Sequence, residues 1–375
     1  MSQKPGGPLA GIRVVEFAAL GPTAFTAMML ADLGATIVRI DRSTGPDRRA
    51  GDPKLDLLNR GRRALALDLK QPAGRAIALA LVGRADLLVE GFRPGVMERL
   101  GLGPDDCQAA NQGLIYARLT GWGQDGPLAD KAGHDINYIA LAGALFPLGD
   151  PQSPPPPPLN LVADYGGGAM FAVTGILAAL VERQRSGRGQ VVDIAMVDGV
   201  SLLLTQIYGW QAMGFWQTRR AANLLDGGAY FYRCYATRDG RHIAVGAIEQ
   251  KFHDAFLTGL GLDSADFPDL LDRRYWAERS ARIAAIVATR DYADWLALFD
   301  KLDACVSPVL SPDEACRHPA NLARRVHIDI EGVLQPAPAP RFGRTPTATP
   351  TPPELPETTM EQVLADWGIT PAAPR

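Results

Sequence analysis

The sequence has few of the residues that bind metals or form disulfides. Its 375 residues include four cysteines and five histidines. The cysteines form no C-x-x-C pair, and no cysteine or histidine has the spacing of a zinc ligand set; they are Cys107, Cys234, Cys305 and Cys316. We therefore expect no disulfide framework and no metal site. A reducing, cytoplasmic location is the simplest expectation.

Other absences argue against further classes of protein. The net charge of -3 leaves no excess of positive charge for nucleic acid or an anionic membrane. No apolar run looks long enough to span a bilayer, and the first residues hold no apolar signal segment. The turn after the first predicted strand reads AALGPTAF, so it has no G-x-G-x-x-G dinucleotide cradle. A Walker lysine and a G-x-S-x-G elbow are missing as well.

The N-terminal part alternates predicted strands with predicted helices. The strands are expected at Ile12–Phe17, Thr36–Asp41, Ala64–Leu69, Asp86–Glu90 and Gly113–Leu119. The helices between them are expected at Thr23–Leu33, Ala73–Arg84 and Pro94–Leu100. Strands that alternate with helices predict an α/β fold with a doubly wound parallel sheet.

The rest of the chain predicts a second, smaller domain. Further segments are expected at Gly133–Leu148 (helix), Asp164–Glu182 (helix), Val191–Met196 (strand), Gly199–Phe215 (helix), Tyr230–Tyr235 with His242–Gly246 (hairpin), Arg282–Phe299 (helical) and Thr359–Trp367 (helix). The proline-rich stretch beyond Glu331 is expected to be extended. We predict a large α/β domain at 1–190 to which 330–375 return, a linker helix region at 191–224 and a small α+β domain at 225–329.

His134 is the histidine with the most suggestive context. It follows Gly133 and begins a predicted helix, with Asp135 beside it. The free N–H groups at a helix N-terminus favour negative charge, so an oxyanion and an imidazole could meet there. The alternative is a histidine that only caps its own helix.

Asp164 precedes three glycines, Gly166–Gly168, at the start of an apolar helix. A structural interpretation makes it an N-cap aspartate. A functional interpretation is that the glycines let a ligand approach the backbone closely. Both interpretations of Asp164 stay open when only the neighbouring residues are considered.

Two arginines follow predicted strands at equivalent ends. Arg42 follows the second strand and Arg93 follows the Asp86–Glu90 strand, with Lys70 as a third candidate. Ligands of open parallel sheets bind beyond the carboxyl ends of the strands, and arginine suits phosphate. Solvated surface charge is the alternative.

Several stretches together resemble a known family. They are RVVEF, ADLGATIVRIDR, LALDLKQP, VEGFRPGVMERLGLGP, LIYARLTGWGQDGP, GHDINY, PLNLVADYGGG, GRGQVVDIAMVDG and VGAIEQKF. They span most of the chain before about Cys305, whereas DACVSPVL and PRFGRTP match less distinctively. The chain resembles the family III CoA-transferases (CaiB/BaiF-like). GHDINY favours the α-methylacyl-CoA racemase branch over the transferases.

The resemblance implies roles for particular residues. His134 and Asp164 correspond to the two acid/base groups, and Glu249 to a glutamate that supports the histidine from the partner subunit. The acyl-thioester would be lined by Gly133, Asp135, Ile136, Asn137, Tyr138 and Asn160. The CoA nucleotide would be held by Arg42, Leu67, Asp68, Leu69, Lys70, Gly91, Phe92 and Arg93. The family also implies an interlocked homodimer and no cofactor beyond the CoA of the substrate.

The implied reaction inverts the α-carbon of a 2-methyl-branched acyl-CoA in lipid metabolism. One group removes the proton from one face, and the other returns a proton to the opposite face. An imidazole suits this role near neutral pH, but the pKa of an ordinary aspartate, about 3.9, would have to be raised by burial. Two alternatives stay open: a CoA-transferase with Asp164 as nucleophile, and a catalytically silent CoA-binding protein. The acyl group (fatty, sterol side chain or aryl-propionate) is left undefined.

Overall fold

The computed structural model describes residues 6–42, 52–353 and 360–369. The chain forms two compact units. The first comprises Met1–Ala142, Pro158–Leu203 and Ala323–Arg375, and the second comprises Gly143–Pro157 and Leu204–Leu322. The predicted domain limits differ from these units, because residues 191–203 belong to the first unit and not to a linker.

The first unit is built on a parallel sheet, as predicted. Its described strands have the order β3-β2-β1-β4-β5-β6, and every neighbouring pair is parallel. The strands are β1 (Arg13–Phe17), β2 (Thr36–Arg42), β3 (Arg62–Leu67), β4 (Leu87–Glu90), β5 (Ile115–Thr120) and β6 (Val191–Ala195). The strand order reverses between β1 and β4, which is where ligands bind in open α/β sheets.

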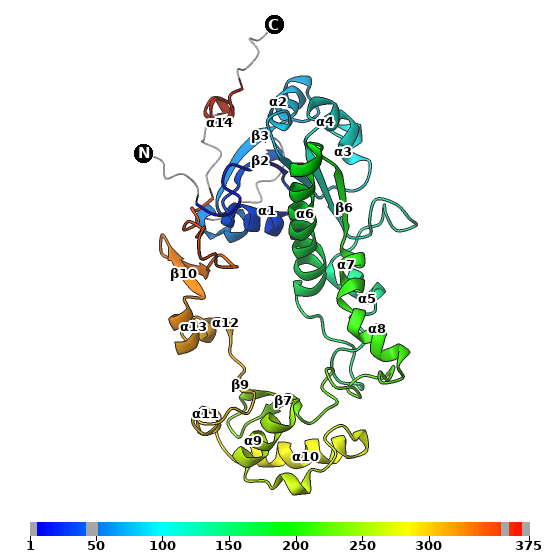
Figure 1. Ribbon diagram of the computed structural model, residues 1–375, viewed down its shortest axis with the longest axis vertical. Coiled ribbons are helices and arrows are strands. Elements are labelled where there is room, and N and C mark those ends of the chain that lie inside the picture. The colour runs from blue at the N-terminus through cyan, green and yellow to red at the C-terminus, as the bar shows by residue number, and fades with distance from the viewer. Residues whose placement is uncertain (1–5, 43–51, 354–359, 370–375) are drawn as a thin grey trace. The chain divides into compact units, whose positions relative to one another are not determined.

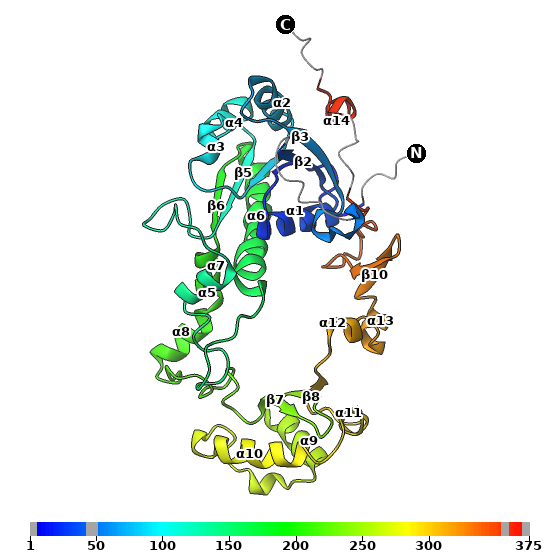
Figure 2. The same cartoon turned by 180° about the vertical axis from the view of Figure 1, so that it is seen from behind.

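Helices cover both faces of this sheet (Figures 1 and 2). The helical segments of the first unit are α1 (Pro22–Asp32), α2 (Pro72–Val82), α3 (Val96–Arg99), α4 (Pro104–Ala110), α5 (Asp135–Leu141), the π-helix η3 (Leu161–Ala169), α6 (Met170–Ser186) and α7 (Met196–Leu203), with short 3-10 turns η1 (Pro53–Leu55) and η2 (Leu57–Asn59). Strand β4 is buried at every residue because it is covered on both faces. Helix α4 was not predicted from the sequence.

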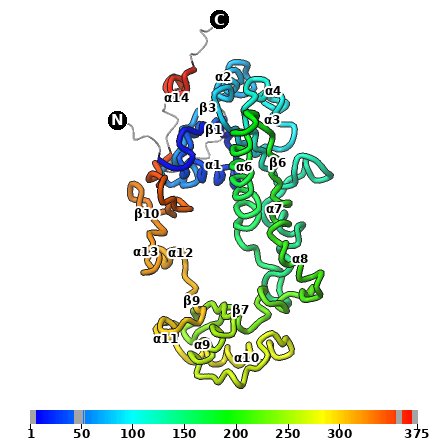
Figure 3. Tube along the Cα trace, in the orientation of Figure 1, coloured from blue at the N-terminus to red at the C-terminus, as the bar shows by residue number. Residues whose placement is uncertain are grey.

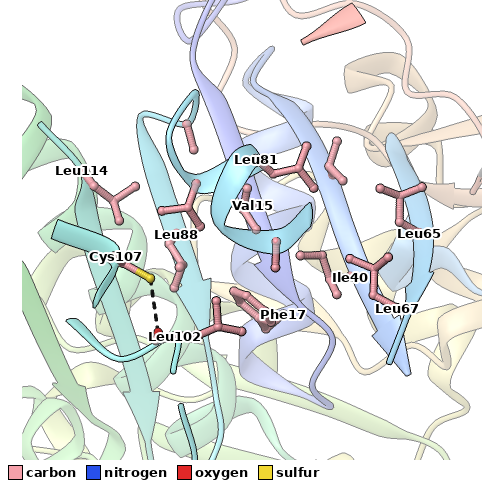
Figure 4. Packing of buried hydrophobic residues seen from close by; sticks show 14 of the residues in the cluster. Val15, Phe17, Ile40, Leu65, Leu67, Leu81, Leu88, Leu102, Cys107 and Leu114 are labelled. Atoms are coloured by element: carbon pink, nitrogen blue, oxygen red, sulfur yellow. Dashed lines mark hydrogen bonds between the residues drawn. The ribbon is translucent and has the colours of Figure 1, made fainter. Parts of the chain in front are cut away.

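One face of the sheet carries a continuous apolar core. Val15, Phe17 and Leu88 of the central strands meet Leu81 of α2 in it (Figure 4). The C-terminal helix α14 (Met360–Asp366) adds Val363 and Leu364 to the same cluster, and Trp367 joins it directly after the helix. Figure 3 shows α14 back beside the N-terminal strands. The predicted first residue of this helix, Thr359, lies outside the described residues.

The helix that carries Asp164 is longer than the sequence suggested. Because η3 and α6 are continuous, residues 161–186 form a helix of 26 residues, and its most apolar stretch of 18 residues has a mean hydropathy of 1.4, which is long and apolar enough to cross a membrane. The expectation that no run has this length was therefore wrong. A mostly buried core helix of a soluble protein passes the same test. This helix packs on β5, β6, α1 and α7, and 39% of its most apolar stretch is buried.

The second unit contains an antiparallel sheet, β7-β8-β9, with helices against it. Its elements are α8 (Thr205–Ala212), β7 (Tyr232–Ala236), β8 (His242–Gly246), α9 (Gln250–Leu260), η4 (Ser264–Asp266), η5 (Arg273–Tyr275), α10 (Trp276–Val287), α11 (Tyr292–Phe299), β9 (Val306–Pro308) and α12 (Pro312–Ala315). Helix α13 (Pro319–Arg324) leads back to the first unit. The predicted hairpin is confirmed, with β7 antiparallel to β8.

Other predicted segments end differently in the structure. Helix α5 stops at Leu141 and not near Leu148, since Gly143 adopts a positive φ of 87° soon after it. The long helix predicted to reach Phe215 is divided into α7 and α8. Part of the proline-rich stretch pairs as a hairpin of β10 (His327–Ile330) and β11 (Val333–Pro336), turning at Glu331 and Gly332, which both have positive φ.

Candidate active site

The predicted nucleotide-binding residues lie at the carboxyl ends of β2, β3 and β4. Arg42 and Leu67 are direct neighbours in the register of β2 and β3, and Arg93 follows β4. Because the strands are parallel, all three ends share one edge of the sheet. Beyond Leu67, the backbone N–H of Lys70 donates to the Asp68 carboxylate at 3.0 Å, which shapes the turn through Leu69. Arg42, Lys70 and Arg93 are exposed there, and their predicted binding of the CoA nucleotide stays a prediction.

The Gly91–Arg93 segment is held in place by buried groups. Glu90 is fully buried, accepts the Phe92 backbone N–H at 2.7 Å and accepts Arg118 Nε at 2.9 Å. A Cβ on Gly91 would lie 2.2 Å from Oγ1 of Thr23 in α1, so only glycine fits. The loop that presents Arg93 is therefore anchored to the sheet and to α1. The buried acid that ends DLLVE was the sequence signal for this anchor, and it was missed.

His134 occupies the N-cap position of α5. Its backbone N–H donates to the Asn137 side chain at 3.0 Å, and its imidazole makes no capping hydrogen bond. The imidazole therefore does not cap the helix, and it is exposed. Asn137 N and Tyr138 N both donate to the His134 carbonyl, which leaves the N–H groups of Asp135 and Ile136 without a partner inside the helix.

Asp164 is not an N-cap, because it is the fourth residue of the π-helix η3. A Cβ on Gly167 would lie 2.8 Å from the Val200 backbone nitrogen, and one on Gly168 would lie 2.8 Å from Cγ of Met196. Both glycines therefore allow η3 to pack closely against α7. The N-cap interpretation was wrong, and the close approach of a ligand to these glycines stays a prediction.

The segments that carry His134 and Asp164 are joined by Asp135. Its Oδ2 accepts the backbone N–H groups of Ala163 at 2.7 Å and of Asp164 at 2.8 Å. These N–H groups belong to the first turn of η3 and lack partners within the helix. A side chain from α5 thus caps the helix that carries the candidate acid. The sequence analysis placed Asp135 in the site for the N–H groups at the start of its helix. It did not predict that the carboxylate of Asp135 would cap η3.

The Asp164 carboxyl lies in a mixed electrostatic environment. Burial raises its pKa above the ordinary value, and so does the nearby negative charge of Asp135. The Asn160 amide, which donates to Asp164 Oδ2 at 3.3 Å, lowers the pKa, as does the charge of His134. The net direction is upward, as two-base chemistry at this aspartate requires.

Tyr138 closes the site from the side of β5. Its hydroxyl donates to the Gly133 carbonyl at 2.5 Å, and its ring meets Trp122 edge-on at 4.8 Å between centroids. A Cβ on Gly121 would lie only 2.1 Å from this ring. Burial first, and then the charge of Asp164, raise the pKa of Tyr138 to about 12. The tyrosine is therefore a neutral hydrogen-bond donor that holds the turn before His134.

Glu249 belongs to the second unit, where it is the N-cap of α9. Its predicted role beside His134 stays a prediction. Among the described residues, no group of three or more His, Cys, Asp or Glu side chains is arranged to hold a metal ion.

Gly21, in the turn after the first predicted strand, lies beside the candidate acid and was not among the predicted site residues. It follows β1 with φ 62° and ψ -118°, a conformation that favours glycine. A Cβ there would lie 3.3 Å from Asp164 Oδ2. The end of β1 at the switch point therefore reaches the candidate acid.

Comparisons with known proteins agree with this architecture. The CoA-transferase family III model matches residues 9–359. A mouse protein named alpha-methylacyl-CoA racemase is 46% identical over 368 residues, which cover 96% of this chain and 94% of that protein. Its human counterpart of the same name is 44% identical over 366 residues, with coverage of 96% and 94%. The crystal structure of a CAIB/BAIF family protein from Brucella suis superposes with a TM-score of 0.82 at 26% identity, covering 96% of this chain and all of that one (100%). This chain belongs to CoA-transferase family III.

Proposed function

We propose that this protein is an isomerase that inverts the α-carbon of 2-methyl-branched acyl-CoA thioesters. The observation that carries the proposal is the pair of His134 and Asp164, which act on each other electrostatically at one edge of the sheet and are tied together through Asp135. The identity of 46% and 44% to two alpha-methylacyl-CoA racemases over 96% of the chain supports it.

The chemistry follows from the two groups. One of them removes the Cα proton as a base, and the electron pair moves onto the thioester oxygen to give an enolate. The other group, in its acid form, returns a proton to Cα from the opposite face. The roles reverse for the other enantiomer. The free N–H groups of Asp135 and Ile136 are suited to donate hydrogen bonds to the enolate oxygen, and no redox cofactor takes part in this scheme.

Deuterium exchange tests the reaction. The purified protein should incorporate deuterium from deuterated water at Cα of a 2-methylacyl-CoA and scramble its configuration. His134→Ala and Asp164→Ala should each lose racemisation, because a single remaining base serves one face of the α-carbon only. Racemisation that survives in both variants would contradict the two-base scheme. A panel of fatty, sterol and aryl-propionyl thioesters, ranked by exchange rate, would define the acyl group.

The alternative is a CoA-transferase with Asp164 as nucleophile. In that reaction the carboxylate attacks the thioester carbonyl, the thiolate of CoA leaves, and an acyl-aspartyl anhydride remains. Hydroxylamine would trap that anhydride at Asp164. α-Proton exchange without a trapped adduct supports racemisation, and tight acyl-CoA binding without exchange or transfer supports a silent binding protein.

Substrate holding and assembly belong to the same proposal. Arg42, the Leu67–Lys70 turn and the Gly91–Arg93 loop would hold the CoA nucleotide, with Arg93→Ala expected to raise KM more than it lowers kcat. The working form would be an interlocked homodimer in the cytoplasm, in which Glu249 of one subunit supports His134 of the other.

Co-expression of His134→Ala with Glu249→Ala tests this sharing of the site. If Glu249 acts across subunits, each mixed dimer holds one intact site, and about a quarter of the wild-type activity should return in a random mixture. If both residues act within one chain, no activity returns.

A further inference from the structure

Asp135 stands out as a buried acid that two backbone N–H groups contact and for which the described residues show no ion pair. It is 5% exposed, and its Oδ2 accepts two N–H groups of the first turn of η3, those of Ala163 and Asp164. Its Oδ1 is buried without a hydrogen-bond partner in the part of the chain that the structure describes. Burying an acid without a counter-ion costs folding free energy, so we infer that this carboxylate has a specific role.

We propose that the Asp135 carboxylate is a positioning residue for proton transfer: it fixes η3 against α5, and its negative charge favours the protonated form of Asp164. This inference rests on the proposed function and extends it to a residue that does not itself exchange a proton with the substrate.

The positioning part follows from the connectivity. His134 and Asp135 are consecutive in the chain. The side chain of Asp135 has only two rotatable torsions, so its carboxylate stays close to the backbone of His134. One of its hydrogen bonds comes from the backbone N–H of Asp164 itself, and the other comes from that of Ala163. The distance between the imidazole and the carboxyl is therefore spanned by one short, stiff link. A displacement of about 1 Å in such a pair can cost on the order of 100-fold in rate.

The electrostatic part of the proposal follows from two carboxyl groups, Asp135 and Asp164, that lie close together where water has little access. The negative charge of Asp135 raises the pKa of Asp164, after burial, which is the largest cause. Asn160 and His134 oppose this shift. In two-base catalysis each group must be able to hold the proton in turn, so an aspartate that releases its proton too easily slows the return step.

Two substitutions separate these roles. Asp135→Asn keeps one oxygen that can accept both N–H groups at the Oδ2 position, but it removes the charge. Asp135→Ala removes the hydrogen bonds as well. Asp130→Asn is the matched control, because Asp130 is an exposed acid four residues before His134 that has no place in the site.

The experiment measures kcat/KM for α-proton exchange against pH, together with a thermal melt of each variant. We expect Asp135→Asn to stay active with the acid limb of its profile moved to lower pH, and Asp135→Ala to lose on the order of 100-fold. Asp130→Asn should match the wild type. An unchanged acid limb in Asp135→Asn, or near wild-type exchange in Asp135→Ala, would overturn the inference.

A direct titration keeps the inference separate from the proposed function. The carboxyl carbon of Asp164, followed by carbon NMR against pH, should titrate at lower pH in Asp135→Asn than in the wild-type protein. If the wild type shows no exchange with any acyl-CoA, the proposed function fails while this comparison still decides the role of Asp135. Identical titrations in the two proteins would remove the electrostatic role whatever the reaction is.

Discussion

Gly21 faces the carboxylate of Asp164 so closely that a β-carbon on the glycine would lie 3.3 Å from Oδ2. The two residues are far apart in the sequence, one after the first strand and the other inside the π-helix. Their contact places the candidate acid at the point where the strand order of the sheet reverses.

Gly21→Ala should impair the site more than the fold. The φ of 62° would strain an alanine by about 1–3 kcal/mol, and its methyl group would press on the Asp164 carboxylate. We expect α-proton exchange to fall roughly 10- to 100-fold through misplacement of the acid. Gly209→Ala is the control, because that glycine lies in α8 with open space around it. Wild-type exchange in Gly21→Ala would show that this contact is unimportant.

Asn160→Ala should move the pH profile in the direction opposite to Asp135→Asn. The Asn160 amide donates to Asp164 Oδ2 and lowers the pKa of that carboxyl. Without it the pKa rises further, so the acid limb of kcat/KM should move to higher pH. Asn321→Ala, which removes an amide donor from the second unit, should leave the limb in place. A limb shifted to lower pH would contradict the assigned role of the amide.

Gly199→Ala should destabilise the first unit through its close contact with η3. A Cβ there would lie 1.9 Å from the Gly167 carbonyl oxygen, so α7 and η3 would have to separate. Overpacking of this kind costs about 1–3 kcal/mol, and we expect at least that loss in the free energy of unfolding measured with urea. Gly209→Ala again serves as the control, with no loss expected. Equal stability of the two variants would mean that η3 and α7 are not packed as described.

His253 should make the second unit sensitive to acid. Its imidazole is fully buried, with Nε2 2.8 Å from the Tyr230 hydroxyl, and burial lowers its pKa. The unfolded chain therefore takes up a proton below about pH 6.5 that the folded unit does not, and stability should fall as the pH drops from there towards the lowered pKa.

His253→Gln should reduce this dependence, although it weakens the unit at neutral pH. Urea unfolding at several pH values, followed by circular dichroism, measures the slope. His242→Gln, at an exposed site on β8, should keep the wild-type slope. A slope that persists in His253→Gln would assign the acid sensitivity to another group.

The order of strands and helices in the first unit could be predicted from local patterns. Ile12–Phe17 and Thr36–Asp41 are apolar runs bounded by breakers, and each is a strand within one or two residues of its predicted limits. Pro72 marks a helix start because its missing N–H is not needed there. Signals of this kind act within one turn or one strand, so they do not depend on how the rest of the chain packs.

Local patterns did not predict the structure where two segments far apart in the sequence pack against each other. Asp164 looked like an N-cap, yet the cap comes from Asp135, and Gly167 and Gly168 pack on α7. Likewise, the end of α5 depended on Gly143, and the hairpin of β10 and β11 depended on pairing between strands.

The sequence by itself determined the α/β class, the candidate pair His134 and Asp164 and, through its motifs, the family. Only the tertiary structure decided how that pair is held. Asp135 reaches a helix 28 residues further along the chain, and Gly21 reaches the same helix from the other side. Hydrogen bonds and close contacts across such separations depend on how whole elements pack, and no pattern within a single element encodes them.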